Sequence, residues 1–184
     1  MRNIDLTNVT EASDFQRPTA GPYICNITKV EDKPVDASGK GDYLHIWYDI
    51  AEGDFKGYYA DIRADHPDWV GVGSYYRSYK ETALGMFKRM CSAITKSNPG
   101  FEFGEKNHDE STLVGKKVGL IFQEEEYYGN DGSLKTRLIV QKEFPVDEID
   151  AQKVPDKKTV DGGRSTGKAD DGFSVVTDTD SLPF

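Results

Sequence analysis

The sequence predicts an all-β domain with one α-helix, followed by a disordered acidic tail. Alternation of apolar and polar residues, which is typical of half-buried strands, recurs in five segments of the chain. One segment between them changes to the period of a helix, and beyond Pro145 the apolar periodicity ends. The chain has 184 residues, which is enough for one domain with its own core and a terminal appendage.

The amino-terminal part of the chain predicts three strands. Turn residues precede a strand-like run at 23–30, and the loop at 32–42 is rich in Pro, Gly and Asp. "YLHIWYDI" at 43–50 alternates between two faces and is the second expected strand. "YYADIRA" at 58–64 is interpreted as the third.

The carboxy-terminal part predicts a helix and then a β-hairpin. Apolar residues at 80–96 recur at helical spacing, and "SNPG" at 97–100 ends that helix. The fourth strand is expected at 116–128 and the fifth at 134–144, with an Asp-Gly turn between them at 129–133.

Five strands with a helix between strands three and four are the elements of the OB fold, a five-stranded Greek-key barrel. Its ligands bind to strands two and three and to the loops that join strands 1–2 and 4–5. Other β-rich barrels can host the same order of elements. We expect this domain to span 1–148. Residues 149–184, rich in Lys, Asp, Gly and Ser, are expected to form a disordered linker and tail.

The formal net charge is −9, but the charge is unevenly distributed. Residues 170–184 contain four aspartates and no Lys or Arg. The acidic mean therefore does not exclude a basic stripe on the body. The first twenty residues contain no apolar run typical of a signal peptide, and no apolar run is long enough to cross a bilayer, so we expect a cytoplasmic protein without a membrane partner. Cys25 and Cys91 are expected to be buried, reduced thiols.

Several stretches carry a resemblance to a known family. They are "NIDLTNV" (3–9), "PTAGPYICNI" (18–27), "YLHIWYDIAEGDFKGYY" (43–59) and "ALGMFKRMCSAI" (83–94). With these stretches the body resembles the bacteriophage single-stranded-DNA-binding proteins of the OB-fold type. The resemblance implies sequence-independent binding and protection of single-stranded DNA during phage replication, recombination or repair. It also implies no catalytic activity, and a location in the cytoplasm of an infected bacterium.

The final residues "DTDSLPF" (178–184) are similar to the acidic tip of bacterial single-stranded-DNA-binding proteins. Thr179 and Ser181 interrupt the acidic run, but the terminal Leu-Pro-Phe is present. The similarity implies that the tail recruits phage or host replication and recombination proteins. The residues expected to bind such a partner are Asp178, Asp180, Leu182, Pro183 and Phe184.

Single-stranded DNA requires aromatic rings for its bases and Lys or Arg for its phosphates. Such residues occur on the outward face of the second strand, on the expected third strand, in "SYYRSYK" (74–80) and around the hairpin turn. The expected DNA-binding residues are Tyr43, Trp47, Tyr59, Arg63, Tyr75, Tyr76, Arg77, Tyr79, Lys80, Tyr127, Tyr128, Lys135 and Arg137. Core packing is the alternative for each aromatic residue. The run "EEE" at 124–126 would repel phosphate.

Two other classes of function stay open from the sequence. An acidic protein could bind another protein, as a nucleic-acid mimic or inhibitor, and its positive residues would then be scattered. A nuclease could hold magnesium between a pair of carboxylates such as Asp61 and Asp65, or Asp65 and Asp68. "GGRSTGK" (162–168) is followed by Ala169 rather than Ser or Thr and lacks the strand and helix of a phosphate loop. No His has a ligand-spaced Cys or His partner, so we expect no structural metal. No Ser lies in a nucleophile-elbow motif and neither Cys has a local catalytic signature, so we expect no enzymatic activity or cofactor. The sequence does not determine whether the protein forms a homo-oligomer.

Overall fold

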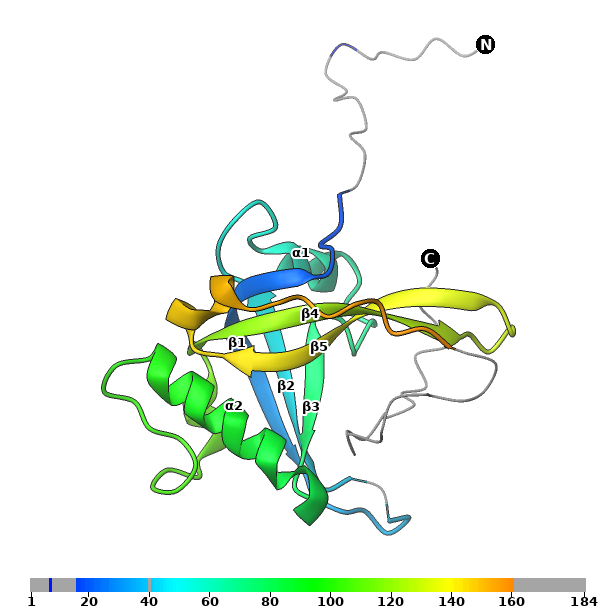
Figure 1. The fold of residues 1–184 in the computed structure, drawn as a ribbon. Helices are drawn as coiled ribbons and strands as arrows, with labels where there is room; N and C mark the ends of the chain where they lie inside the picture. Colours follow the sequence, from blue (N-terminus) through cyan, green and yellow to red (C-terminus); the bar gives the residue numbers. More distant parts are fainter. Residues whose placement is uncertain (1–6, 8–15, 40, 161–184) are drawn as a thin grey trace, which may run out of the picture.

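Five antiparallel strands form one open sheet in the order β3-β2-β1-β4-β5 (Figure 1). The structure is a computed structural model, and it describes residues 7, 16–39 and 41–160. The strands are β1 (Gly21–Lys33), β2 (Tyr43–Ile50), β3 (Ser74–Ser78), β4 (Lys117–Tyr128) and β5 (Leu134–Phe144). The fold is mostly β, in partial agreement with the predicted all-β class, and the strands predicted at 43–50, 116–128 and 134–144 agree with β2, β4 and β5 to within one residue.

Two α-helices and three short 3-10 turns accompany the sheet in the described residues. They are α1 (Tyr58–Asp65), η1 (Glu81–Ala83), α2 (Leu84–Ser97), η2 (Glu110–Leu113) and η3 (Val146–Ala151). The helix α2 lies between β3 and β4 in the chain, as predicted. Its carboxyl end is joined to β4 by Asn98. The Asn98 amide donates to Ile94 O at 2.7 Å and to Lys117 O at 2.8 Å, and its oxygen accepts from Lys117 N. None of these described helices is long and apolar enough to cross a membrane.

The strand predicted at 58–64 is wrong, because these residues form α1. Gly57 precedes the helix in the left-handed conformation, with φ of 84°, which glycine adopts without strain. Asp49 Oδ1 accepts the backbone N–H of Tyr59 at 3.0 Å, so a side chain from β2 satisfies an early helical amide. The third strand is instead β3, which lies within "SYYRSYK" (74–80), a stretch in which DNA-binding residues are predicted.

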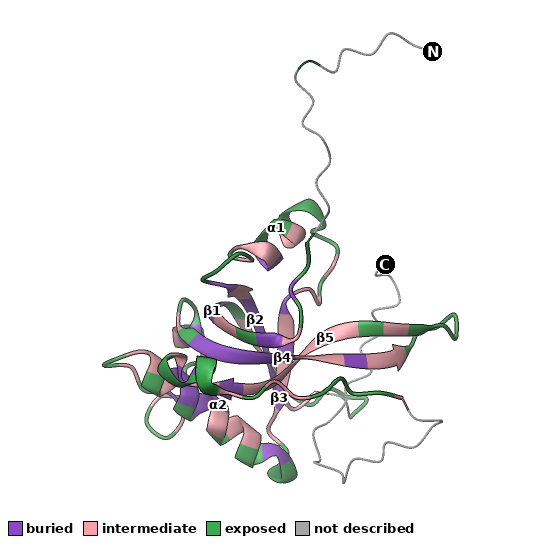
Figure 2. Ribbon diagram, turned by 45° about the horizontal axis from the view of Figure 1, so that its top comes forward, coloured by how far each residue is buried: buried purple, intermediate pink, exposed green. Residues whose placement is uncertain are grey.

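The core lies between the inner face of the sheet and α2. Leu44, Ile46, Tyr48 and Ile50 of β2 alternate into it. Both cysteines are buried and free, as predicted, and burial raises the pKa of the Cys91 thiol to about 11. Buried residues concentrate where β1, β2 and β4 pack together, whereas the tip of the β4–β5 hairpin is exposed (Figure 2).

A buried ion pair joins the two edge strands of the sheet. Arg77 of β3 places Nε 2.5 Å from Oε1 of Glu143 of β5, although the N–H is not aligned for a hydrogen bond. The side chains are 7% and 1% exposed. Burial alone lowers the pKa of Arg77, but the facing carboxylate raises it above its ordinary value overall. This pair therefore holds β3 against β5 where no backbone pairing joins them in the described residues.

Ordered structure extends beyond the domain boundary predicted at residue 148. That position lies inside η3, and residues 152–160 then run beside β4 (Figure 1, orange). Lys158 N donates to Glu124 O, and Glu126 N donates to Lys158 O, both at 2.8 Å. The segment therefore pairs with the edge of β4 that extends past β1.

Candidate nucleic-acid interface

The outer face of β1, β2 and β3 carries aromatic and basic side chains side by side. In β2, the residues that alternate with the core residues 44, 46, 48 and 50 have side chains on this face. An irregularity between Ile27 and Lys29 shifts the register of β1, so that Lys29, rather than Thr28, is opposite Trp47. We call this surface the aromatic face, and its residues are Lys29, Glu31, Lys33, Tyr43, His45, Trp47 and Tyr76.

Four rings of the aromatic face form one continuous row. The ring centroids of Trp47 and His45 are 3.5 Å apart, and those of His45 and Tyr76 are 4.1 Å apart. Tyr43 meets Tyr76 edge to face at 4.9 Å. Cross-strand pairing produces this row, because His45 is directly opposite Tyr76 on β3.

Exposure differs along the row. Trp47 is 5% exposed, and its indole N–H donates to Val70 O at 3.0 Å, so the segment after α1 covers it. His45 is 6% exposed, whereas Tyr43 and Tyr76 are only half-buried. The two tyrosines are therefore the accessible rings of the row. His45, which contacts the Trp47 ring, packs against Tyr76.

Lysines from β1 lie next to this row. Lys29 Nζ is 4.5 Å from the centroid of the Trp47 ring, and Lys33 is the cross-strand partner of Tyr43. Each lysine places Nζ 2.6 Å from one carboxylate oxygen of Glu31, and these two contacts lower the pKa of Glu31 to about 2. The lysine side chains are 58% and 44% exposed. Cations and rings thus share one solvent-facing surface.

Burial lowers the pKa of His45 to about 4, so its imidazole is neutral at pH 7. Its Nε2 atom is buried and has no hydrogen-bond partner. A buried polar atom without a partner typically costs about 1–3 kcal/mol. His45 is therefore the polar group of the aromatic face whose hydrogen-bonding capacity is not satisfied.

The projecting part of the β4–β5 hairpin, which we call the arm (residues 123–139), also carries aromatic and basic side chains. Its cations are engaged by carboxylates. Arg137 binds Glu125 Oε2 through Nε at 2.9 Å and through a terminal nitrogen at 2.7 Å, and Lys158 binds Glu125 Oε1 at 2.7 Å. Arg137 also lies 4.9 Å from the Tyr127 ring, and Lys135 lies 3.5 Å from Asp131. Tyr128 is exposed at the tip. Glu125 of the acidic run and Asp131 at the turn thus neutralise the two cations of the arm, Arg137 and Lys135.

Four of the expected DNA-binding residues have structural contacts instead. Tyr59, Tyr75 and Arg77 are buried. Arg63 donates to Tyr48 O at 3.2 Å and to Val72 O at 3.1 Å, which holds α1 against the sheet.

Two further candidates follow β3. The ring of Tyr79 packs against Phe87 of α2 with centroids 5.1 Å apart. Lys80, on the segment that enters η1, is exposed and lies beyond the aromatic row in the chain. The structure therefore brings Tyr43, Trp47 and Tyr76 of the predicted set together on the aromatic face. Four other predicted residues lie on the arm: Tyr127, Tyr128, Lys135 and Arg137.

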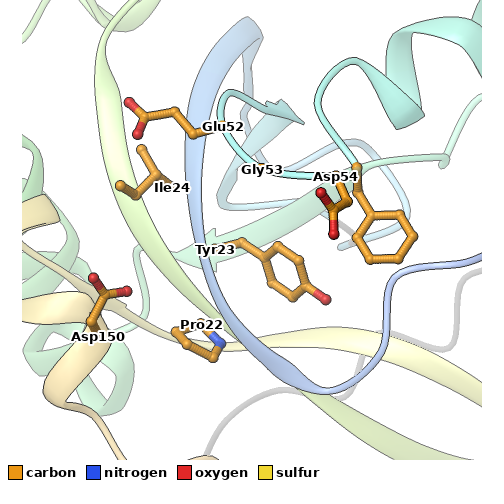
Figure 3. Close-up of a pocket in the computed structure, with 8 residues that line it drawn as sticks. Pro22, Tyr23, Ile24, Glu52, Gly53, Asp54 and Asp150 are labelled. Atoms are coloured by element: carbon orange, nitrogen blue, oxygen red, sulfur yellow. The ribbon is translucent and has the colours of Figure 1, made fainter.

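A shallow pocket of about 320 Å³ lies on a different part of the molecule. Figure 3 shows Glu52, Asp54 and Asp150 around it, together with Tyr23. Glu52 pairs with Lys117 at 2.8 Å. The acidic lining of this pocket does not suit a phosphate ligand. Among the described residues, no three His, Cys, Asp or Glu side chains are grouped so that they could hold a metal ion.

Comparison with known proteins adds no relative: no protein-family model matches the chain, and no curated protein matches it. The tail residues expected to bind a partner, 178–184, lie outside the described residues. Sequence reasoning missed Lys29, Lys33 and His45. The alternation of 43–50 had placed His45 beside Tyr43 and Trp47, which was the available signal.

Proposed function

We propose that this protein binds single-stranded DNA through the aromatic face. The observation that carries the proposal is the row of rings ending in the accessible Tyr43 and Tyr76, with Lys29 and Lys33 beside it. An unpaired base stacks on an aromatic ring with about 1–3 kcal/mol, whatever its sequence, while lysines attract the phosphates. In a duplex the base faces are already stacked, so this surface favours single strands.

We also infer a partly open barrel of the OB type. The edge strands β3 and β5 are held together by the buried Arg77–Glu143 pair, so the open sheet curves toward closure along that line. The aromatic face lies on β2 and β3, the strands that OB folds use for nucleic acid. Binding and protection of single strands during phage replication or recombination, with partners recruited by the tail, is the role that the resemblance implies.

The proposal is tested by titrating a labelled thymidine oligomer with the protein and following fluorescence anisotropy. Changing Tyr43→Ala and Tyr76→Ala together removes both accessible rings, and we expect affinity to fall by about 1–3 kcal/mol for each base released. The matched control is Tyr127→Ala with Tyr128→Ala on the arm, which we expect to change affinity by less than about twofold. Equal affinity of the unaltered protein for duplex and single strand would contradict the proposal.

A protein-binding function is the second candidate. It is favoured by the net charge of −9 and by the carboxylates that pair with the arm's cations, Arg137 and Lys135. An acidic module of this kind would not bind the oligomer at any salt concentration. The same titration therefore separates the two candidates.

A further inference from the structure

We propose that Lys29 and Lys33 form a phosphate subsite which Glu31 occupies in the free protein, and that Glu31 moves to His45 when nucleic acid binds. The inference rests on the proposed function and extends it, because it names the residues that regulate binding. It predicts that binding of DNA is accompanied by uptake of a proton.

The two lysines already hold an anion in the geometry that a phosphate requires. Their Nζ atoms approach different oxygens of one carboxylate, each at 2.6 Å. A phosphate likewise offers several oxygens to two ammonium groups. Lys33 is opposite Tyr43, so a phosphate bound here lies beside the ring on which we place a base. Glu31 therefore stands in for the ligand and competes with it.

Displaced from the lysines, Glu31 can turn to a polar group on the neighbouring strand. His45 is its cross-strand partner on β2, and the His45 Nε2 atom is buried without a hydrogen-bond partner. A protonated imidazole can donate an N–H to the carboxylate, which satisfies both groups. The proton comes from the solvent, and no covalent bond other than the N–H is formed or broken.

The charged groups around His45 all favour protonation in the bound state. In the free protein, burial keeps the pKa of His45 at about 4; Glu31 raises it, and Lys33 and Lys29 lower it. A phosphate would neutralise both lysines and leave Glu31 without its cations, so the pKa of His45 must rise. The other neighbours are the rings of Tyr43 and Trp47 on its own strand and Tyr76 on β3. The segment that covers Trp47 contributes the exposed His66, which stacks on Trp69.

The experiment measures the affinity for a labelled thymidine oligomer between pH 5.5 and pH 8 at constant salt. Thymine does not titrate in this range, so the protein supplies any pH dependence. We expect the affinity of the unaltered protein to rise as the pH falls. Calorimetry in two buffers of different ionisation enthalpy should show proton uptake on binding at pH 6.

The decisive variant is Glu31→Gln, which keeps the shape of the side chain and removes its charge. We expect it to bind the oligomer more tightly at pH 8, because the carboxylate no longer competes with phosphate for the two lysines. The gain should be only about threefold to tenfold, since solvent-accessible ion pairs are weak. Its affinity should be nearly independent of pH. Glu52→Gln is the matched control, since Glu52 is also exposed and pairs with a lysine at 2.8 Å, away from the aromatic face. His66→Gln controls for the neighbouring histidine and should keep the pH dependence.

The outcomes separate this inference from the proposed function. If the unaltered protein binds the oligomer but its affinity does not change with pH, the inference is overturned and the function stands. The same holds if Glu31→Gln and Glu52→Gln have equal effects. If the unaltered protein does not bind the oligomer, both are overturned. A rise in the pKa of His45 on binding, followed by NMR, would support the inference without any variant.

Discussion

Two carboxylates in this protein each bind two cations, and the surroundings of the two clusters differ. Glu31 holds Lys29 and Lys33, which are its near neighbours on β1, and its side chain is 31% exposed. Glu125 holds Arg137 of β5 and Lys158 of the terminal segment, and its side chain is 9% exposed. The first cluster joins residues of one strand. The second ties three separate segments together. The same ion-pair chemistry therefore lies near the solvent on the aromatic face, where we propose that it exchanges, and joins separate segments at the arm.

The difference in burial predicts the order of the energetic effects. Exposed ion pairs contribute little to stability, because water and salt screen them and the long side chains lose entropy. Removing one partner of a buried pair costs much more, because a charge is left without compensation in the interior. The following substitutions extend the comparison from the buried Arg77–Glu143 pair, through Glu125, to the solvent-accessible pairs of Glu31.

The largest effect is expected at the seam between β3 and β5. Arg77→Met leaves Glu143 buried without a cation, and should lower the free energy of unfolding by about 3–5 kcal/mol. Urea unfolding measures this change. Combining Arg77→Met with Glu143→Leu removes both charges and should recover most of the loss. If the single variant loses less than about 1 kcal/mol, burial does not determine how much these ion pairs contribute to the free energy of unfolding.

A smaller effect is expected at the arm. Glu125→Gln leaves Arg137 and Lys158 without their shared carboxylate, and should lower the free energy of unfolding by about 1–3 kcal/mol. The backbone amides of Glu126 and Lys158, which bond across the two segments, should exchange hydrogen faster. The control is Glu126→Gln, because Glu126 forms an ion pair with one lysine, Lys157 at 2.8 Å, in the described residues. If the control has an equal effect, the cluster at Glu125 has no special structural role.

The parts of the fold that local sequence determines could be predicted. Period-two alternation and an Asp-Gly turn locate β4 and β5, and the 3.6-residue period locates α2. The segment at 58–64 could not be assigned this way. Its helix depends on Asp49, ten residues earlier, and on Arg63 reaching the carbonyl of Val72. Contacts between distant residues override the local pattern there.

The candidate site was predicted in composition but not in detail. Alternation placed Tyr43 and Trp47 on the outward face of their strand, and the structure agrees. The cover over Trp47 comes from Val70, 23 residues away, and no local signal reveals it. Misplacing the third strand also hid the difference between Tyr75, which enters the core, and Tyr76, which joins the row. His45 was passed over because an isolated histidine has no ligand spacing, although its neighbours on the face are aromatic.

The smallest effect on stability is expected at Glu31. Glu31→Gln should lower the free energy of unfolding by less than about 1 kcal/mol at pH 7, because both ion pairs are exposed. Lys29 and Lys33 lower the pKa of Glu31 to about 2. Its contribution is therefore fully present above the ordinary glutamate pKa of about 4.3 and is lost as the pH falls toward 2. Urea unfolding of both proteins at pH 7 and pH 3 measures the difference, which should shrink at the lower pH. If Glu31→Gln destabilised the protein as much as Glu125→Gln, Glu31 would be a structural residue, and its exchange for a phosphate would carry too great a cost.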